Sequence, residues 1–187
     1  RSSDLPLETD DPVQETIETA FINTSRNKIN RNGLAGFPFG SICNVFEVMR
    51  TDQKDRGTLR ASKKKRRARS SSKHRLLWHG APMGVIASIL KSGLRIMPGS
   101  GGRLGKGIYL ADMAAKSGFY AKPTKDGLCC LFLCEADCGR PFVILRDSTE
   151  SSRRTSAPKR FGSVNAHGIE LPDPKGDVTM SFDSNDV

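Results

Sequence analysis

Two short segments of the chain pair a polar or aromatic side chain with glycine. His79-Gly80 ends the apolar run at 76–78, and Tyr109 follows closely on the glycine-framed segment 105–107. An imidazole beside a residue without a side chain offers a hydrogen-bonding group next to backbone that a ligand can approach closely. Taken alone, each residue is more often structural, because a histidine at the end of a strand commonly satisfies its hydrogen bonds within the fold.

The glycine-rich segment 99–107 invites comparison with a phosphate-binding loop, but its spacing does not fit. A Walker A loop needs glycine where this chain has Ser100, and serine or threonine where it has Gly107. A dinucleotide-binding pattern that starts at Gly99 fails at Leu104. The spacing alone therefore predicts a flexible surface loop.

Four of the five cysteines lie close together, at Cys129, Cys130, Cys134 and Cys138. They could form a metal site or be buried thiols. No histidine is nearby and no pair of CxxC motifs is present, so we expect buried thiols in a reducing compartment and no metal.

The positive charge is concentrated in one segment. Residues 50–75 hold twelve Lys or Arg and two Asp, a net charge of +10, and the rest of the chain is neutral. We expect residues 1–49 and 76–187 to form the fold and 50–75 to be a disordered basic insertion. Its centre, 63–69, remains open to three interpretations: a solvated loop, a nuclear-import signal or a nucleic-acid contact. No run of eighteen apolar residues is present, so no membrane partner is expected.

The remaining patterns predict an α+β fold with mainly antiparallel sheets and short helices. Helical spacing or capping residues indicate helices at 15–24, 82–90 and 112–120, with Asp112 as the N-cap of the third. The second should bury the face formed by Val85, Ile86, Ile89 and Leu90. Strands are expected at 42–49, 76–78, 108–110, 127–135, 142–145 and 178–182, with the rest of 148–186 mostly loop.

Taken together, these segments resemble the catalytic domain of poly(ADP-ribose) polymerases. The resemblance lies in the order and approximate spacing of residues 77–80, 93–96, 105–113 and 116–120. The stretch 94–103 is most similar to the third, DNA-damage-responsive branch of that family. The resemblance covers roughly residues 15–50 and 75–183 and leaves out the basic insertion. It implies the ADP-ribosyltransferase fold, with an NAD cleft, and a nuclear or also cytoplasmic glycosyltransferase active in DNA repair.

The same resemblance implies that the enzyme cleaves the nicotinamide–ribose bond of NAD and transfers ADP-ribose to protein acceptors. The nicotinamide amide would be bound by the Gly80 backbone and the Ser117 hydroxyl. Tyr120 would stack on the nicotinamide ring, and Tyr109 would line its other side. His79, which with Tyr109 would serve catalysis, would hydrogen-bond a ribose 2′-hydroxyl.

Three further positions follow from the resemblance. Arg95 and Ala81 would contact the adenosine half of NAD, and Ala81 replaces a hydroxyl-bearing residue common there. Lys116 would lie beside the site, in a position tied to acceptor handling.

The family's third catalytic element is a glutamate on a late strand, several tens of residues after a segment like 171–174. No glutamate follows Glu170 in this sequence, so no residue is assigned to that role. Asp137 and Cys138 also depart from the small or apolar residues that the family has there. We expect a fragment that stops before the last strands, binds NAD weakly and transfers little ADP-ribose. An inactive NAD- or partner-binding pseudoenzyme is the alternative.

Overall fold

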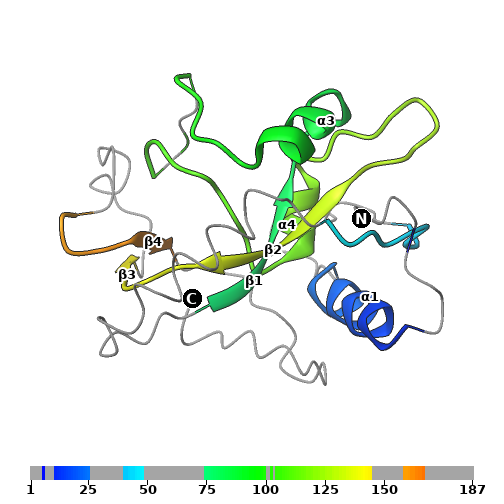
Figure 1. Cartoon of the computed structure of the whole chain (residues 1–187), viewed down its shortest axis with the longest axis horizontal. Helices are drawn as coiled ribbons and strands as arrows, with labels where there is room; N and C mark the ends of the chain where they lie inside the picture. The colour runs from blue at the N-terminus through cyan, green and yellow to red at the C-terminus, as the bar shows by residue number, and fades with distance from the viewer. Residues whose placement is uncertain are drawn as a thin grey trace, which may run out of the picture.

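The computed structural model describes residues 6, 11–25, 40–48, 74–99, 102, 104–144 and 158–166. These residues form an α+β arrangement of three helices and four strands (Figure 1). The helices are α1 (Pro12–Ser25), α3 (Met83–Ser92) and α4 (Ala114–Gly118), and the strands are β1 (His74–Gly80), β2 (Leu131–Asp137), β3 (Pro141–Ile144) and β4 (Ser163–Ala166).

Strands β1 and β2 form the antiparallel ribbon at the centre of the molecule (Figure 1). Trp78 faces Leu133 across the ribbon, and Gly80 faces Leu131. On its other edge, Trp78 exchanges two backbone hydrogen bonds with Ala111, of 2.7 and 2.9 Å. The end of β1 therefore has structure on both sides, which holds His79 and Gly80 in place.

The strand expected at 108–110 is not formed, and only the bridge to Ala111 is present. If that ladder continued, the Tyr109 carbonyl would accept from the Gly80 N–H. Instead the Tyr109 carbonyl accepts a hydrogen bond from the His79 side chain. The chain there is used to position a side chain, not to extend the sheet.

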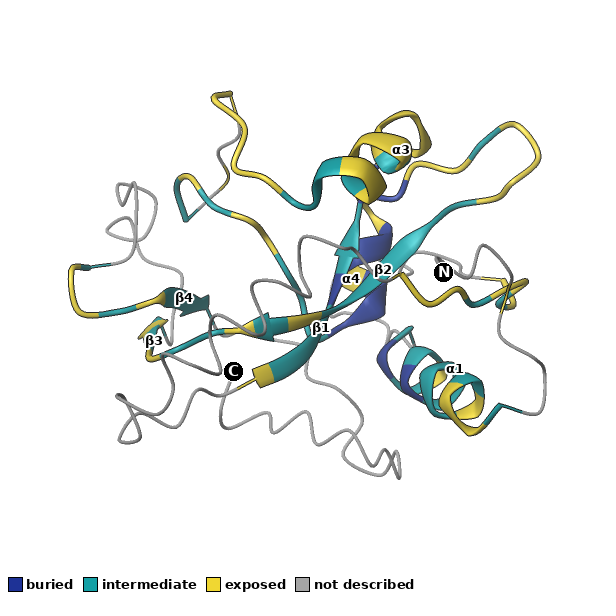
Figure 2. Ribbon diagram, in the orientation of Figure 1, coloured by how far each residue is buried: buried dark blue, intermediate teal, exposed yellow. Residues whose placement is uncertain are grey.

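The core is small and centres on Trp78, which is 3% exposed. Its indole packs against Ala20 of α1 and Ala114 of α4, with the Phe21 ring edge-on at 6.0 Å. Figure 2 shows the buried residues gathered on α4, on the adjoining part of β1 and on the inner side of α1. This core joins α1 and α4 to the strand that carries His79.

Two helices agree with the sequence prediction. Helix α1 starts earlier than expected because Pro12 begins it and the Asp11 carboxylate accepts from the Val13 N–H at 2.8 Å, a typical N-cap. Helix α3 ends at Gly93, whose φ of 75° suits glycine. However, none of the α3 residues is fully buried, so the expected buried face is not found among the described contacts.

Two other elements are shorter or shifted. Helix α4 has five residues and its N-cap position is Met113, so the assignment of Asp112 as N-cap was wrong. Strand β2 begins at Leu131 and not at 127, because Thr124 and Leu128 close a turn with a 2.8 Å hydrogen bond. Gly127 adopts a φ of 78° within that turn, which strand backbone does not allow.

The second sheet was not predicted as it stands. Strands β3 and β4 pair in parallel, so the described residues hold one antiparallel and one parallel pair. Strand β4 lies in the region expected to be mostly loop.

The described part of 42–49 forms no strand, and β1 begins at His74, inside the segment assigned to the basic insertion. Residues 50–73 and 178–182 lie outside the described residues. No helix in the described part of the chain has the length and apolar character needed to cross a membrane.

Candidate functional site

His79 is oriented by the backbone of a distant segment. Its Nδ1 lies 2.8 Å from the Tyr109 carbonyl oxygen. Because a carbonyl only accepts, Nδ1 must carry the proton. In the neutral ring Nε2 is then the acceptor, which suits a ligand hydroxyl that donates.

Gly80 lies directly against the backbone of α4. A Cβ at this position would overlap the Ser117 carbonyl oxygen and lie 2.7 Å from the carbonyl carbon. The Ala121 nitrogen would be 3.2 Å away. Glycine is therefore required by the packing of β1 on α4, a reason that the sequence pattern did not reveal, in addition to the access to ligand that it suggested.

Helix α4 and the residues just after it hold three of the predicted site residues. Ser117 is 4% exposed and its carbonyl accepts from the Tyr120 N–H at 3.0 Å. Tyr120 is 62% exposed, and Lys116 is also exposed. The short helix thus holds Ser117 beside Gly80 and leaves the Tyr120 ring uncovered one turn later.

Tyr109 contacts the glycine-rich segment as well as His79. Its hydroxyl donates to the Gly105 carbonyl at 2.6 Å and accepts from the Leu104 N–H at 3.1 Å. A Cβ on Gly102 would meet the Tyr109 ring at 2.8 Å, so the absence of a side chain admits the ring. Gly102 and Leu104 are neighbours of the site that the sequence did not single out, because nothing local marks a contact with a residue further along the chain.

The two residues assigned to the adenosine half of NAD are placed differently. Ala81 is buried directly after β1. Arg95 is exposed, and its Nε donates to the Ser92 carbonyl at 3.3 Å. The described contacts of Arg95 do not bring it to the other predicted site residues.

Asp112 is a further charged group beside the site. Burial raises the pKa of this carboxyl above its ordinary value, although the N–H groups of Asp112 and Met113 and the cations of Lys116 and Arg75 partly oppose the rise. The sequence prediction treated Asp112 only as a helix cap. The apolar residues that follow it, at 113–115, were the available sign that this carboxyl is partly buried.

The clustered cysteines are partly buried, free thiols. Burial raises the pKa of Cys134 to about 11 and also raises that of Cys138. No group of three or more potential metal ligands occurs among the residues that the structure describes.

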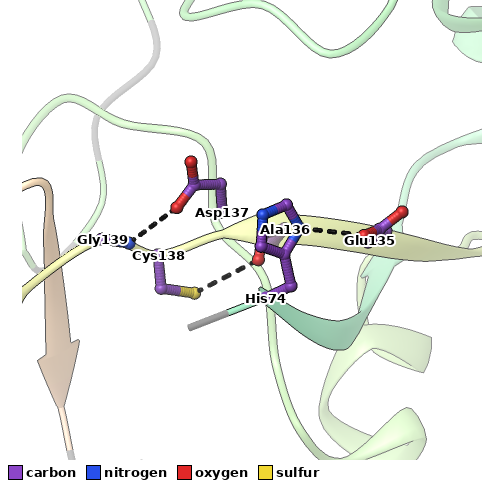
Figure 3. Close-up of polar contacts among 6 residues, drawn as sticks. All are labelled: His74, Glu135, Ala136, Asp137, Cys138 and Gly139. Atoms are coloured by element: carbon purple, nitrogen blue, oxygen red, sulfur yellow. Dashed lines mark hydrogen bonds and ion pairs between the residues drawn. The ribbon is translucent and has the colours of Figure 1, made fainter. Parts of the chain in front are cut away.

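Asp137 and Cys138, which depart from the expected pattern, lie where β2 turns toward β3. Figure 3 shows the Asp137 carboxylate accepting from the Gly139 N–H at 3.1 Å, and the Cys138 sulfur beside the Ala136 carbonyl. In the same view His74 Nδ1 pairs with the Glu135 carboxylate at 2.8 Å. These contacts lie at the end of the ribbon opposite Gly80, away from the predicted site residues.

Comparison with known proteins identifies the same family that the motifs resemble. A family model described as the poly(ADP-ribose) polymerase catalytic domain matches residues 27–185. "Protein mono-ADP-ribosyltransferase PARP3" of Gallus gallus is 45% identical over 113 residues, which cover 60% of this chain and 21% of the relative. The Homo sapiens protein of that name is 45% identical over 116 residues, with the same coverage. "Poly [ADP-ribose] polymerase 1" of Caenorhabditis elegans is 38% identical over 102 residues, 52% of this chain and 11% of the relative. The chain thus spans about a fifth of the length of the first curated relatives that it matches.

Proposed function

The chain belongs to the poly(ADP-ribose) polymerase catalytic-domain family, and from that premise we propose that it supplies the NAD site of an NAD⁺ ADP-ribosyltransferase. In this reaction the bond between the nicotinamide nitrogen and the ribose carbon breaks. Nicotinamide leaves with the bonding electrons as a neutral ring, and positive charge develops on the ribose. An acceptor nucleophile on a protein then forms the new bond to that carbon and loses its proton.

One observation carries the proposal: the end of β1 meets both Tyr109 and α4. His79 is hydrogen-bonded to the Tyr109 carbonyl, and Gly80 lies against Ser117. A nicotinamide amide needs one donor and one acceptor in close approach, which a glycine backbone and a serine hydroxyl supply. The uncovered Tyr120 ring offers a stacking surface close to these groups.

The contact with Tyr109 leaves Nε2 of His79 free to accept from a ribose hydroxyl. With Nδ1–H committed to the Tyr109 carbonyl, Nε2 accepts from the 2′-hydroxyl. This contact would orient the ribose for the departure of nicotinamide. Arg95 and Ala81 are proposed to lie toward the adenosine half, and Lys116 toward the acceptor.

We also propose the wider setting. Residues 1–49 and 76–187 belong to one catalytic domain with a basic insertion between them, whose centre at 63–69 contacts nucleic acid. The protein is nuclear, also cytoplasmic, and takes part in DNA repair. The first relatives are named as mono-ADP-ribosyltransferases, which supports transfer of single ADP-ribose units to protein acceptors and disfavours the pseudoenzyme alternative. No metal is assigned a role.

The test is NAD binding by the 187-residue chain, measured by calorimetry. His79→Ala should weaken binding roughly fivefold to tenfold, the loss expected for one hydrogen bond. His74→Ala is the matched control, because it removes an exposed imidazole at the other end of β1. Equal affinities for the two variants would contradict the proposed site, and so would a folded chain that binds no NAD.

A further inference from the structure

Tyr109 contacts His79 through its backbone and the glycine-rich segment through its side chain. Its carbonyl accepts from His79, and its hydroxyl makes both described contacts with the glycine-rich segment, at Leu104 and Gly105. Tyr109 is 40% exposed, so burial alone does not fix its ring. The hydroxyl therefore uses its proton and a lone pair in contacts with the same segment.

Three backbone N–H groups of the turn that Tyr109 contacts already donate to partners within the protein. The Gly102 and Gly105 N–H groups donate to each other's carbonyls, at 3.3 and 2.9 Å. The Leu104 N–H donates to the Tyr109 hydroxyl. These three amides are therefore unavailable for a phosphate, which such loops usually bind through N–H groups. The hydrogen bonds of the turn therefore fix its own shape and its contact with Tyr109.

We propose that Tyr109 is a positioning residue whose hydroxyl fastens the turn at Gly102, Leu104 and Gly105 beside His79, so that the turn forms one wall of the NAD site. This inference rests on the proposed function for the identity of the ligand. The fastening itself rests on the hydrogen bonds and on the space that Gly102 leaves for the ring. Tyr109 would thus raise the affinity for NAD by holding the turn in place, in addition to lining the nicotinamide ring.

Trypsin can report on the fastening because Lys106 directly follows the turn and is exposed. Proteolysis of a folded protein follows the population of the locally opened form. Tyr109→Phe keeps the ring and removes the hydroxyl, so cutting after Lys106 should become roughly fivefold to thirtyfold faster, as loss of two hydrogen bonds predicts. Cutting after Lys125, in the loop before β2, is the internal standard and should not change.

Two further variants distinguish loss of the Tyr109 hydrogen bonds from a general destabilisation of the fold. Tyr120→Phe removes the chain's other phenolic hydroxyl and should leave the cutting rate at Lys106 unchanged. Gly102→Ala should accelerate cutting as Tyr109→Phe does, because its methyl group displaces the ring. NAD at saturation should slow cutting at Lys106 in the wild type, and the affinity of Tyr109→Phe for NAD should fall threefold to tenfold.

The outcomes distinguish the two claims. An unchanged rate at Lys106 in Tyr109→Phe overturns the fastening, whatever NAD does. Faster cutting in that variant, with no NAD binding by the folded wild type, supports the fastening and overturns the proposed function. NAD that binds the wild type without protecting Lys106 contradicts the turn as a wall of the site.

Discussion

Replacing Gly80 with alanine tests the junction of β1 and α4 on which the site depends. The new Cβ would overlap the Ser117 carbonyl oxygen and lie 2.7 Å from its carbon, whereas carbon atoms pack at roughly 3.5–4.0 Å. The obstructing atoms are backbone, so no rotamer change relieves the overlap, and α4 must move by about 1 Å or more. Overpacking typically costs about 1–3 kcal/mol, and we expect the upper end here.

The assay is thermal unfolding followed by circular dichroism, together with NAD calorimetry. For a chain of this size, a loss of ~3 kcal/mol lowers Tm by about 6–12 °C. Gly84→Ala is the matched control, because a Cβ there meets nothing within 4 Å and the residue lies in α3. That control should stabilise by about 0.5–1 kcal/mol, as alanine for glycine in a helix does. A Gly80→Ala variant as stable as the wild type would refute the packing argument.

The remaining predictions concern titration and reactivity. Burial raises the pKa of the Asp112 carboxyl, so the folded state holds that proton more tightly than the unfolded state. The stability from this group is present at low pH and is lost as pH rises from about 3.8 through the folded pKa. The free energy of unfolding of Asp112→Asn, measured by urea titration, should therefore rise relative to that of the wild type over this pH range. A difference between the two that does not change with pH would contradict the raised pKa. Iodoacetamide at pH 8 should alkylate exposed Cys43 faster than Cys134, whose pKa is about 11, because thiolate is the reactive form. Mass spectrometry gives the two rates, and faster labelling of Cys134 would show that it is not buried.

Local signals in the sequence predicted the elements that depend on local interactions. Apolar periodicity located both α1 and α3, and Gly93 marks the end of α3 by its backbone preference. The start of α1 at Pro12 was not predicted. Strand β1 was found from its apolar run. The start of β2 was wrong because it depends on the Thr124–Leu128 turn, in which Gly127 has a positive φ.

Features that depend on distant partners were not predictable in this way. Strand β4 pairs with β3 across a long connection, and no periodic pattern indicates a parallel partner. No strand forms at 108–110, where the Tyr109 carbonyl accepts from the side chain of His79, thirty residues earlier in the chain.

The candidate site also combines features that the sequence indicates with features that only the structure shows. The resemblance grouped His79, Gly80, Tyr109 and Ser117 as a site, and the structure places His79 against Tyr109 and Gly80 against Ser117. Their role in binding NAD stays a prediction. The physical reason for Gly80, close packing against the Ser117 carbonyl, required the structure.

The most direct test of the account is a two-dimensional ¹H–¹⁵N NMR titration of the chain with nicotinamide, ADP-ribose and NAD. Nicotinamide alone should shift the amide signals of Gly80 and Ser117. ADP-ribose should instead perturb the signals of His79 and Arg95, and NAD should produce both sets of shifts. Saturable shifts confined to residues away from the end of β1 and α4 would contradict the assignment of the NAD site, as would no shift at all in a folded chain.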